Sequence, residues 1–381
     1  MEYLFYTLIG LVLYTYLGYF AVLYLWSKVA PKRYVDAGRS FEPSVSVVIA
    51  VRDEARHIED KLLNILAQDY PKTKIEIIVV SDGSTDQTEK LIQALIERQI
   101  PKQGHSPVKL VALSQPKGKP NAINLGVASA SGEIVVFADA RQRFAGDAVA
   151  QLVGRFEDEN VGCVSGELVF EQTPGSLIER EMGAYWKFEK KIRQMESETG
   201  SVVGASGSIY AIRRSLFQPI PRQTLLDDVL IPLQIRNQGF RVVFQNSAKA
   251  YDNPSHDFKE EKKRKIRTLA GNWQLLAMQP KLLDPFYNPL FFKFISHKVL
   301  RLLVPFALIG ICLSSLSLCI SVQIALVTAI VVSLAICFHE SFMPRKERLL
   351  KVGAVLRAFW LLNYFAFLAP FCVLTRQKLW R

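Results

Sequence analysis

Acidic side chains in this chain follow short apolar runs, and their order along the sequence suggests a site for a charged ligand. The motifs are Val51-Arg52-Asp53-Glu54, Ser81-Asp82-Gly83-Ser84, Asp139-Ala140-Arg141 and Leu226-Asp227-Asp228. Each of the first three directly follows an apolar run of strand length, so we expect their carboxylates at the ligand-binding edge of a parallel sheet. Aspartates without neighbouring histidine or cysteine suit a hard divalent cation, Mg²⁺ or Mn²⁺, together with a diphosphate. The motifs therefore indicate an enzyme that handles a nucleoside diphosphate.

The elements that must position these motifs alternate between strand and helix patterns. Strand-like runs at 45–51, 75–81, 108–113 and 133–138 alternate with helix-period segments at 54–68, 86–98 and 120–130. Such a series predicts a parallel sheet with helices on both faces. After Phe144 the pattern becomes mixed, with helical stretches at 147–159 and 177–198 and strand-like runs at 161–170 and 208–212. The chain shows no internal repeat or low-complexity linker, so we expect one compact α/β domain.

The turn after the second strand-like run has both a structural and a chemical explanation. Gly83 permits a tight turn, and Thr85 or Asp86 can cap the following helix. Capping explains Asp86 but not Asp82, which stands at the end of the strand-like run. A carboxylate at that place can accept hydrogen bonds from a uracil or a ribose. We therefore assign Asp82 to nucleoside binding.

Several stretches are apolar enough to lie in a membrane. Residues 3–26 carry no charge, and about 24 residues at a rise of ~1.5 Å exceed the ~30 Å hydrocarbon core. The uncharged stretch 302–338 has room for two crossings joined by a turn near 314–321, and 358–374 forms a weaker last span interrupted by Asn363 and Pro370. We expect an N-terminal membrane helix over 1–27 and a C-terminal membrane region of about three helices over 298–375.

Positive charge indicates the side of the membrane on which the soluble part lies. Lys28, Lys32, Arg33 and Arg39 follow the first span and no basic residue precedes it, so the positive-inside rule places the next segment in the cytoplasm. The formal net charge is +12. Its excess lies beside the membrane segments and within 259–267, where anionic lipid headgroups explain it better than nucleic acid. We expect a multi-pass protein of the cell membrane with a cytoplasmic catalytic domain.

From about residue 45 to residue 273, these motifs resemble those of membrane-embedded family-2 glycosyltransferases with a GT-A fold, the group that includes cellulose, hyaluronan and poly-N-acetylglucosamine synthase-like enzymes. The first segment is similar to the family's first nucleotide loop, with Asp53 in place of the usual Asn. The second is similar to its base-binding turn. Gly118-Lys119-Pro120-Asn121-Ala122-Ile123-Asn124 resembles the segment in which the family sets a lysine near the donor. The resemblance implies donor contacts from Ala50, Arg52, Glu54, Asp82 and Lys119.

The third motif departs from the family's pattern. Asp139-Ala140-Arg141 stands where the family carries a metal-binding Asp-x-Asp, but the second acid is replaced by Arg141. Either Asp139, water and the diphosphate hold the cation, or Arg141 supplies positive charge to the phosphates directly through bidentate contacts. We expect the metal at Asp139, because a diphosphate itself supplies oxygen ligands, and we retain Arg141 among the donor-binding residues.

The fourth motif resembles the acidic pair whose second member is the family's general base. Inversion at the anomeric carbon requires removal of a proton from the acceptor hydroxyl, and a carboxylate can accept it. Helix starts also favour acids for electrostatic reasons, so one member of the pair could be structural. We expect catalysis by Asp228, with Asp227 beside it. The preceding loop, with Gly204, Ser206 and Gly207, resembles the family's loop near the donor sugar and the acceptor.

The segment that leads to the C-terminal spans allows two interpretations. Arg264-Lys265-Ile266-Arg267-Thr268 falls where processive relatives carry Gln-x-x-Arg-Trp, and only Arg267 matches. We assign Arg267 to the diphosphate, and the missing Trp argues against polymer synthesis. Residues 256–297 read equally well as a basic amphipathic segment lying on anionic lipid. His297, at its end, is expected to anchor the chain at the membrane interface.

Together these observations predict a GT-A (Rossmann-like) α/β domain over 40–255 joined to membrane helices. The expected activity is inverting transfer of a sugar from a nucleotide-sugar donor, UDP-linked, to a membrane lipid or growing glycan. Transfer onto polyprenyl phosphate is an alternative of the same class. A transporter would place charged groups within its spans, and 3–26 and 302–338 have none. A non-catalytic scaffold stays open because of Arg141.

Overall fold

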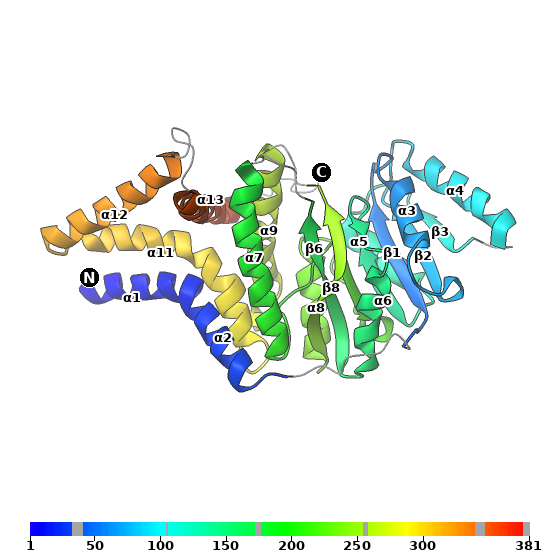
Figure 1. Cartoon of the computed structure of the whole chain (residues 1–381), viewed down its shortest axis with the longest axis horizontal. Coiled ribbons are helices and arrows are strands. Elements are labelled where there is room, and N and C mark those ends of the chain that lie inside the picture. Colours follow the sequence, from blue (N-terminus) through cyan, green and yellow to red (C-terminus); the bar gives the residue numbers. More distant parts are fainter. Residues whose placement is uncertain (33–40, 104–105, 172–176, 254–257, 340–346, 376–381) are drawn as a thin grey trace.

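The computed structural model describes residues 1–32, 41–103, 106–171, 177–253, 258–339 and 347–375. A mixed β-sheet with flanking helices lies at one end, apolar helices lie at the other, and helices α7 (Leu177–Glu198) and α9 (Phe258–Met278) stand between them (Figure 1). Arg33 and Arg39, on which the predicted orientation in the membrane partly depends, lie outside the described residues.

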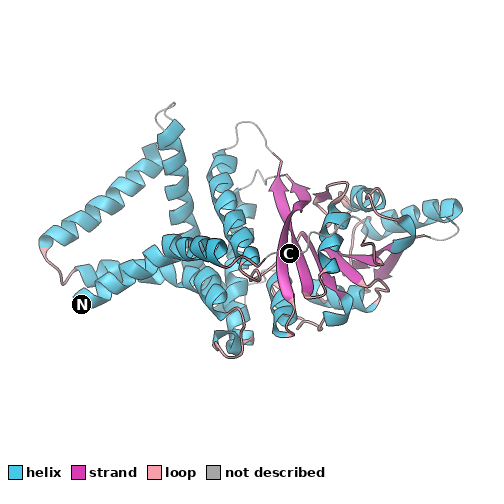
Figure 2. Ribbon diagram, turned by 60° about the horizontal axis from the view of Figure 1, so that its bottom comes forward, coloured by secondary structure: helices cyan, strands magenta, loops and turns pink. Residues whose placement is uncertain are grey.

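The described strands form one sheet (Figure 2). Their order across it is β3-β2-β1-β4-β7-β6-β8-β5. Strands β3, β2, β1 and β4 run parallel, whereas β7 pairs antiparallel with both β4 and β6. The predicted parallel sheet is therefore confirmed for the first half of the domain, and the second half is mixed, also as predicted. The strands are β1 (Val45–Val51), β2 (Ile75–Ser81), β3 (Val108–Ala112), β4 (Ile134–Ala138), β5 (Arg143–Phe144), β6 (Val161–Phe170), β7 (Ile209–Arg213) and β8 (Arg241–Asp252).

Each face of the sheet has its own apolar core because side chains alternate along a strand. In β1, Val47 and Ile49 belong to one buried cluster and Val48 to the other. The first cluster is covered by α3 (Ile58–Leu66), α4 (Thr88–Gln103) and α6 (Ala148–Val153), and the second by α5 (Lys119–Ala128) and α8 (Asp227–Asn237). The result is a three-layer α/β/α domain that holds the strand ends, and the loops after them, in fixed positions.

Two of the longer elements of the sheet domain differ from the sequence expectation. The helix expected over 147–159 is α6 followed by a 3-10 turn, Gly154–Glu157. Strand β8 was not expected at all. It is the longest of the described strands, and its buried side chains are Val242, Val243, Phe244, Gln245, Ala248 and Ala250. Its polar residues interrupt the alternation of apolar and polar side chains that is typical of a strand. In the sheet, β8 pairs with both β6 and β5.

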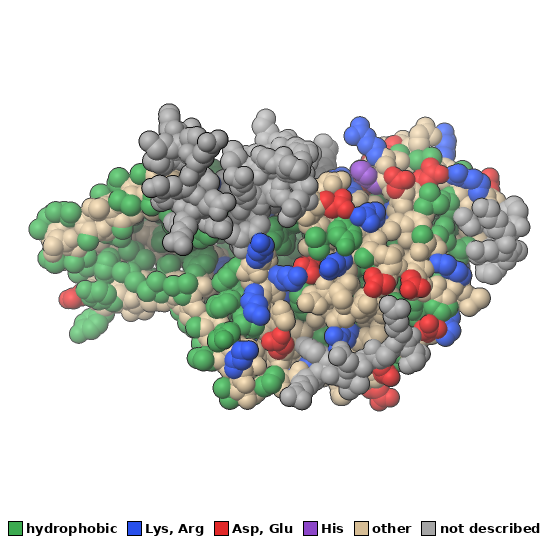
Figure 3. Space-filling model, in the orientation of Figure 1, with side chains coloured by type: hydrophobic (Ala, Val, Ile, Leu, Met, Phe, Trp, Pro, Cys, Tyr) green, Lys and Arg blue, Asp and Glu red, His purple; other side chains and the backbone are tan. Residues whose placement is uncertain are grey.

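Four helices among the described residues are long and apolar enough to cross a membrane, at Glu2–Val29, Phe291–Ser315, Ile320–Cys337 and Gly353–Val373. Their hydrophobic side chains dominate the surface at that end of the molecule (Figure 3). They correspond to α1 (Glu2–Leu13) with α2 (Tyr19–Val29), α10 (Phe291–Phe294) with α11 (Leu300–Ser315), α12 (Ile320–His339) and α13 (Glu347–Leu374). The π-helical turns Tyr14–Gly18 and Ile295–Val299 join the first two pairs.

The second of these candidate spans begins earlier than expected and carries charge. It starts at Phe291 rather than at residue 298, and its first half contains Lys293, His297, Lys298 and Arg301. Of these, Lys293 and His297 were expected in the interfacial segment 256–297. His297 is only 2% exposed. The expectation that His297 anchors the chain at the membrane interface is therefore wrong, because its ring is buried against α7, as described below.

Helices α7 and α9 connect the sheet domain to the apolar helices. Helix α7 packs against α2 and α13, and α9 packs along α13. The ammonium of Lys262 lies 5.5 Å from the ring centre of Tyr364, and that of Lys265 lies 4.8 Å from the ring centre of Trp186. Two lysines that the sequence offered for lipid headgroups thus lie over aromatic rings of neighbouring helices.

Candidate active site at the carboxyl ends of the parallel strands

The loops after β1 and β2 are joined by hydrogen bonds. Asp53 has a left-handed backbone with φ of 54°, which Asp tolerates better than most residues. Its Oδ1 accepts hydrogen bonds from the backbone N–H of Thr85 at 2.7 Å and from the Thr85 hydroxyl at 3.1 Å. Ala50 is partly buried at the end of β1 and Arg52 is exposed. The first two sequence motifs therefore form one wall of the site.

Asp82 is 5% exposed and holds the loop that leads to Lys119. Its Oδ1 accepts the backbone N–H of Lys117 at 2.7 Å, and its Oδ2 accepts that of Gly118 at 2.8 Å. Gly83 is required beside it, since its φ is +64° and a Cβ there would lie 2.7 Å from the backbone nitrogen of Pro116. A carboxylate oxygen has a second lone pair, so a nucleoside contact stays a proposal for Asp82 in addition to this supporting role.

Lys119 joins the second half of the site to the first. It is the first residue of α5, and its Nζ lies 3.0 Å from Oδ1 of Asp139 and 3.9 Å from Oδ2 of Asp227. Burial would lower the pKa of Lys119, but Asp139 and Asp227 outweigh burial and raise it. The lysine is therefore a fixed cation between two acids that are 88 residues apart in the sequence.

The arginine in the loop after β4 pairs with a glutamate of the first motif. Nε of Arg141 lies 3.2 Å from Oε1 of Glu54, and the Arg141 side chain is 62% exposed. Beneath this loop, Nζ of Lys61 donates a hydrogen bond to the carbonyl of Gln142 at 2.7 Å and lies 3.6 Å from the ring centre of Phe144. Burial lowers the pKa of Lys61 to about 7, and Asp139 opposes that shift.

Sequence reasoning missed Lys61, although a signal was present. It lies in the buried stripe of α3 that also contains Ile58, Leu62 and Ile65. A lysine at an apolar position of an amphipathic helix is unusual, and here it supports the loop that carries Asp139.

The described residues fit a divalent cation only when a donor completes its ligands. They contain no group of three or more His, Cys, Asp or Glu side chains that could hold a metal. Asp139 offers one carboxylate, 37% exposed and bonded to Lys119 through Oδ1. Because Mg²⁺ prefers about six oxygen ligands, the diphosphate and water would supply the rest.

The acidic pair opens α8. Asp227 is 5% exposed, and burial raises its pKa from 3.8 to about 6, against the effect of Lys119 and with help from Asp228. Burial also raises the pKa of Asp228, opposed by Lys119, Lys298 and Arg193. A carboxylate with a raised pKa is a better proton acceptor than an ordinary aspartate, so this pair can remove a proton from a hydroxyl.

The glycine-containing loop lies directly against Asp228. The backbone N–H of Ala205 donates to the carbonyl of Asp228 at 2.7 Å. A Cβ on Gly207 would lie 3.1 Å from Oδ2 of Asp228, and one on Gly204 would lie 3.3 Å from its carbonyl oxygen. The N–H of Ser206 donates to the Ser165 hydroxyl at 2.9 Å, which ties the loop to β6. The structure thus brings the loop and the acidic pair together.

Helix α9 reaches the site through the segment ahead of α8. The side chain of Gln274 donates to the carbonyl of Gln223 at 2.7 Å and accepts from the N–H of Leu225 at 2.9 Å. A Cβ on Gly271 would lie 2.6 Å from Cγ of Leu226. Arg267 is partly buried one helical turn earlier, and residues four apart share a helix face. Arg267 therefore lies on the same face of α9 as Gly271, which packs against Leu226, the residue before the acidic pair.

Most of the chain matches known protein families. Residues 46–220 match the family described as glycosyl transferase family 2, and residues 134–340 match glycosyl transferase family group 2. The two matches together span the sheet domain, α7, α9 and the first two candidate spans after it.

Individual relatives agree with this assignment. A probable glycosyltransferase, YdaM, from Bacillus subtilis is 26% identical over 249 residues, and a poly-beta-1,6-N-acetyl-D-glucosamine synthase from Staphylococcus aureus is 25% identical over 236 residues. These alignments cover 60% and 61% of this chain, and the chain spans about half of each relative, 55% in both cases.

A solved structure matches almost the whole chain. It is the mannosyltransferase PcManGT from Pyrobaculum calidifontis in complex with GDP-Man and Mn²⁺, at 24% identity and a TM-score of 0.74. The superposition covers 98% of this chain and 99% of that protein. The architecture, a GT-A domain joined to apolar helices, is thus one that a glycosyltransferase is known to adopt.

Proposed function

The chain belongs to glycosyl transferase family group 2, and we propose that it moves a sugar, with inversion, from a UDP-linked donor to a membrane-associated glycan or lipid. That it is a glycosyltransferase with a GT-A fold follows from the family and structural matches. The donor base, the stereochemistry and the acceptor are the parts that we propose. The observation that supports the inverting mechanism is the position of Asp228, which faces the glycine-containing loop and belongs to the same charged group as Lys119 and Asp139.

In the proposed reaction, the acceptor hydroxyl lies between the glycine-containing loop and Asp228. Oδ2 of Asp228 takes the hydroxyl proton while the acceptor oxygen forms a bond to the anomeric carbon. The bond from that carbon to the diphosphate breaks on the opposite face, so one inversion results. Gly207 suits this place because a larger residue would intrude on the Asp228 carboxylate.

The leaving diphosphate needs positive charge. Lys119 is already fixed beside Asp139, and Arg267 lies on the nearby face of α9. We propose that Asp139 holds a divalent cation, Mg²⁺ or Mn²⁺, which when bound would stabilise charge on the diphosphate oxygens. The structural relative is solved with Mn²⁺ and a nucleotide sugar, which supports the proposal. The Arg141 side chain is exposed and paired with Glu54, and we propose that it turns toward the donor as a second cation.

We further propose that Ala50, Arg52, Glu54 and Asp82 contact the nucleotide, because the loops that carry them form one wall of the site. The cell membrane is the proposed location, with the four apolar helices as spans and the catalytic domain on the cytoplasmic side. Contacts with anionic lipid headgroups remain part of this proposal, whereas we expect no nucleic-acid partner.

Transfer onto polyprenyl phosphate is a second candidate, and one observation favours it. Arg193 from α7 and Lys298 from the candidate span Phe291–Ser315 both act electrostatically on Asp228. An anionic acceptor that approaches from the membrane would therefore meet positive charge next to the proposed base.

The proposed function can be tested with purified protein in lipid nanodiscs. UDP-linked and GDP-linked sugars carrying a radiolabel are supplied with Mn²⁺, and release of nucleoside diphosphate is measured with a neutral glycolipid or polyprenyl phosphate as acceptor. We expect turnover with a UDP-sugar and label in the lipid fraction, and none in the Asp228→Asn variant. Preference for a GDP-sugar would overturn the donor assignment, and release from no donor would overturn the transfer reaction.

A further inference from the structure

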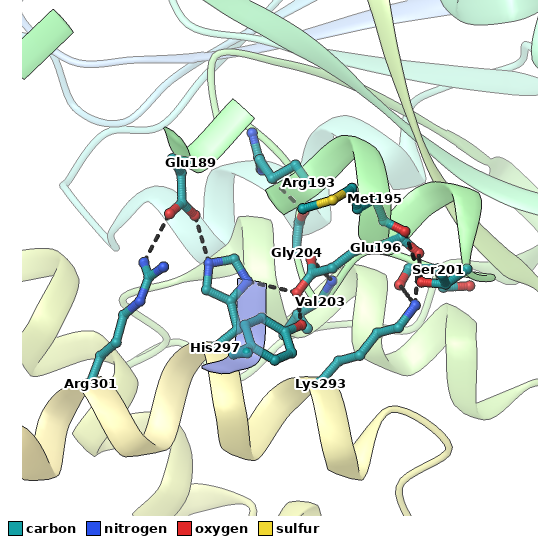
Figure 4. Close-up of polar contacts among 12 residues, drawn as sticks. Glu189, Arg193, Met195, Glu196, Ser201, Val203, Gly204, Lys293, His297 and Arg301 are labelled. Carbon is teal, nitrogen blue, oxygen red and sulfur yellow. Dashed lines mark hydrogen bonds and ion pairs between the residues drawn. The ribbon is translucent and has the colours of Figure 1, made fainter. Parts of the chain in front are cut away.

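A buried group of charged residues lies outside the candidate site, where α2, α7 and the candidate span Phe291–Ser315 meet (Figure 4). We call it the junction cluster; its members are Tyr19, Glu189, Glu196, Lys293, His297 and Arg301. His297 lies between two acids, with Nδ1 2.7 Å from Oε1 of Glu196 and Nε2 2.7 Å from Oε1 of Glu189. The Tyr19 hydroxyl donates to the same Glu196 oxygen at 2.6 Å, and Arg301 donates to Oε2 of Glu189 at 2.8 Å. Three segments far apart in the sequence thus share one polar network.

Both ring nitrogens of His297 take part in this network. Each lies at hydrogen-bond distance from a carboxylate oxygen, one of Glu196 and one of Glu189. Burial would raise the pKa of Glu189, but His297 and Arg301 outweigh it and hold that pKa well below its usual range. Burial would also raise the pKa of Glu196, but His297 outweighs it and that pKa is lowered. His297 is therefore held between two buried carboxyl groups.

The junction cluster continues into the loop that faces Asp228. Glu196 lies near the C-terminal end of α7, and its Oε2 accepts the backbone N–H of Val203 at 3.4 Å. Lys293 donates to the carbonyl of Glu196 at 2.7 Å and to that of Ser201 at 3.0 Å. Each contact fixes the start of the loop from the membrane side.

The far end of the same loop touches the proposed base. Arg193, one turn from Glu189 on α7, donates to the carbonyl of Gly204 at 3.1 Å. The next residue, Ala205, donates its N–H to the carbonyl of Asp228. An unbroken path of hydrogen bonds and short chain segments therefore runs from His297 through Glu196 and Val203 to Asp228.

Stability alone does not account for such a cluster. Replacing a buried ion pair by apolar side chains of similar volume is often neutral or stabilising, whereas removing one partner is costly. A charged network is better suited to fixing one arrangement among several packings, because each hydrogen bond demands a particular direction.

We propose that His297 is a positioning residue: through Glu196 it holds the loop of residues 200–208 in register with Asp228, so that the membrane helices complete the support of the active site. The proposal rests on the proposed function, because it takes Asp228 as the base. In consequence, the sheet domain depends on the correct docking of α2 and α11 for turnover. Binding of the nucleoside diphosphate, which uses loops on the other side of the site, does not.

The test compares three variants in nanodiscs, His297→Gln, Glu196→Gln and the double variant. For each, we would measure kcat, the KM for the donor, the affinity for the nucleoside diphosphate by calorimetry, and the melting temperature. We expect kcat to fall about 100-fold in His297→Gln, since a misplacement of ~1 Å can cost that much, while donor KM and nucleotide affinity stay within about twofold. The double variant should lose little more than His297→Gln alone, because both residues act on one network.

Ser314→Ala serves as the matched control. Ser314 is buried in the same candidate span, and its hydroxyl bonds to carbonyls of its own helix, Gly310 at 2.7 Å and Ile311 at 3.2 Å. This variant should keep the wild-type kcat even where it lowers the melting temperature. If His297→Gln lowers the melting temperature as Ser314→Ala does and leaves kcat unchanged, the cluster is merely structural and the proposal fails.

A second measurement keeps the proposal separate from the activity itself. Hydrogen exchange followed by mass spectrometry reports the backbone of residues 200–208 without any substrate. We expect faster exchange in this loop in His297→Gln and Glu196→Gln, and no change in Ser314→Ala. Unchanged exchange would overturn the positioning role even if the proposed reaction is correct. If the loop exchanges faster in these variants but the protein transfers no sugar, the coupling of His297 to the loop stands and the proposed function is rejected. Tyr19→Phe, which removes one hydrogen bond to Glu196, replaces His297→Gln if that variant does not fold.

Discussion

The edge of the parallel sheet and the junction with the membrane helices both collect charged side chains, but they do so in different ways. At the sheet edge, Asp82 and Asp227 are buried, but the ion pairs of Arg141 with Glu54 and of Lys119 with Asp139 are partly exposed. At the junction, Glu196 and His297 are only 1% and 2% exposed and are bonded on several sides. Partly exposed pairs can exchange partners for a ligand at little cost, whereas buried charges cannot. The sheet edge is therefore suited to binding a charged ligand, whereas the junction is suited to fixing the packing of the helices that meet there.

The largest expected effect lies where the two regions meet. Asp228→Asn should lower kcat by about 10²–10⁴-fold, the usual cost of losing a general base, because the amide keeps the shape but accepts no proton. Affinity for UDP should stay near that of the wild type. Turnover assays with calorimetry check both. Asp227→Asn is the matched control, and a larger loss in that variant would move the base to Asp227.

The next largest effect concerns the cation. If Asp139 and the diphosphate hold a divalent ion, then EDTA and Asp139→Ala should each reduce activity by about 10²–10³-fold, comparable with the loss of one strong electrostatic contact. Arg141→Asp should tighten Mn²⁺ binding, measured by titration calorimetry in the presence of UDP. Full activity in excess EDTA, with a severe loss in Arg141→Ala, would instead make the arginine the replacement for the metal.

A smaller effect is expected at the nucleotide wall. Asp82→Ala removes a carboxylate that bonds two backbone amides of the loop ahead of Lys119. Since a hydrogen bond to a charged group contributes about 1.5–3 kcal/mol, we expect loss of the proposed contact between Asp82 and the nucleoside to lower UDP affinity about 10- to 100-fold. Asp147→Ala, whose acid bonds Gln151 on α6, is the control and should bind UDP normally. Unchanged UDP affinity in Asp82→Ala would restrict Asp82 to a purely local role.

The smallest effect is a pH dependence. The pKa of Asp227 is raised to about 6 and that of Asp228 is also raised, chiefly by burial. Because the base must be ionised, log(kcat/KM) should fall as the pH is lowered through the raised pKa of Asp228, with a slope of about one. The effect of pH on stability has the opposite direction. Because the pKa of Asp227 is higher in the folded protein than in the unfolded chain, protonation of Asp227 stabilises the folded state. This stabilisation is fully present below pH 3.8 and is lost as the pH rises through about 6. Asp227→Asn should remove much of that loss in thermal melts. A flat rate profile from about pH 5 to about pH 8 would separate the pair from the chemistry.

Local patterns in the sequence were sufficient for the first half of the fold. The strands β1, β2, β3 and β4 were expected within one residue of their observed bounds, because each is an apolar run that ends at a turn motif. The helix α7 was expected at its observed bounds. In contrast, β8 is long, partly polar and defined by its pairing with β6 and β5. Pairing partners of that kind are fixed only when the rest of the sheet is in place.

The candidate site divides in the same way. The motif residues were identified in the sequence because turns and strand ends demand particular residue types at particular spacings. The junction cluster was not identified, although Lys293, His297 and Arg301 recur every four residues and so share one helix face. Their partners, Glu189 and Glu196, lie more than 100 residues away from His297, and no local pattern connects the two stretches.

The sequence by itself therefore determined the fold class, the order of the acidic motifs and the presence of apolar helices, since these depend on residue type and short-range periodicity. Only the tertiary structure decided which charges are neighbours. In it, the Asp82 carboxylate accepts hydrogen bonds from backbone amides, Lys119 lies between Asp139 and Asp227, and His297 is buried between two glutamates. Burial and the distance between charges control these interactions, and both quantities exist only once distant segments of the chain have packed together.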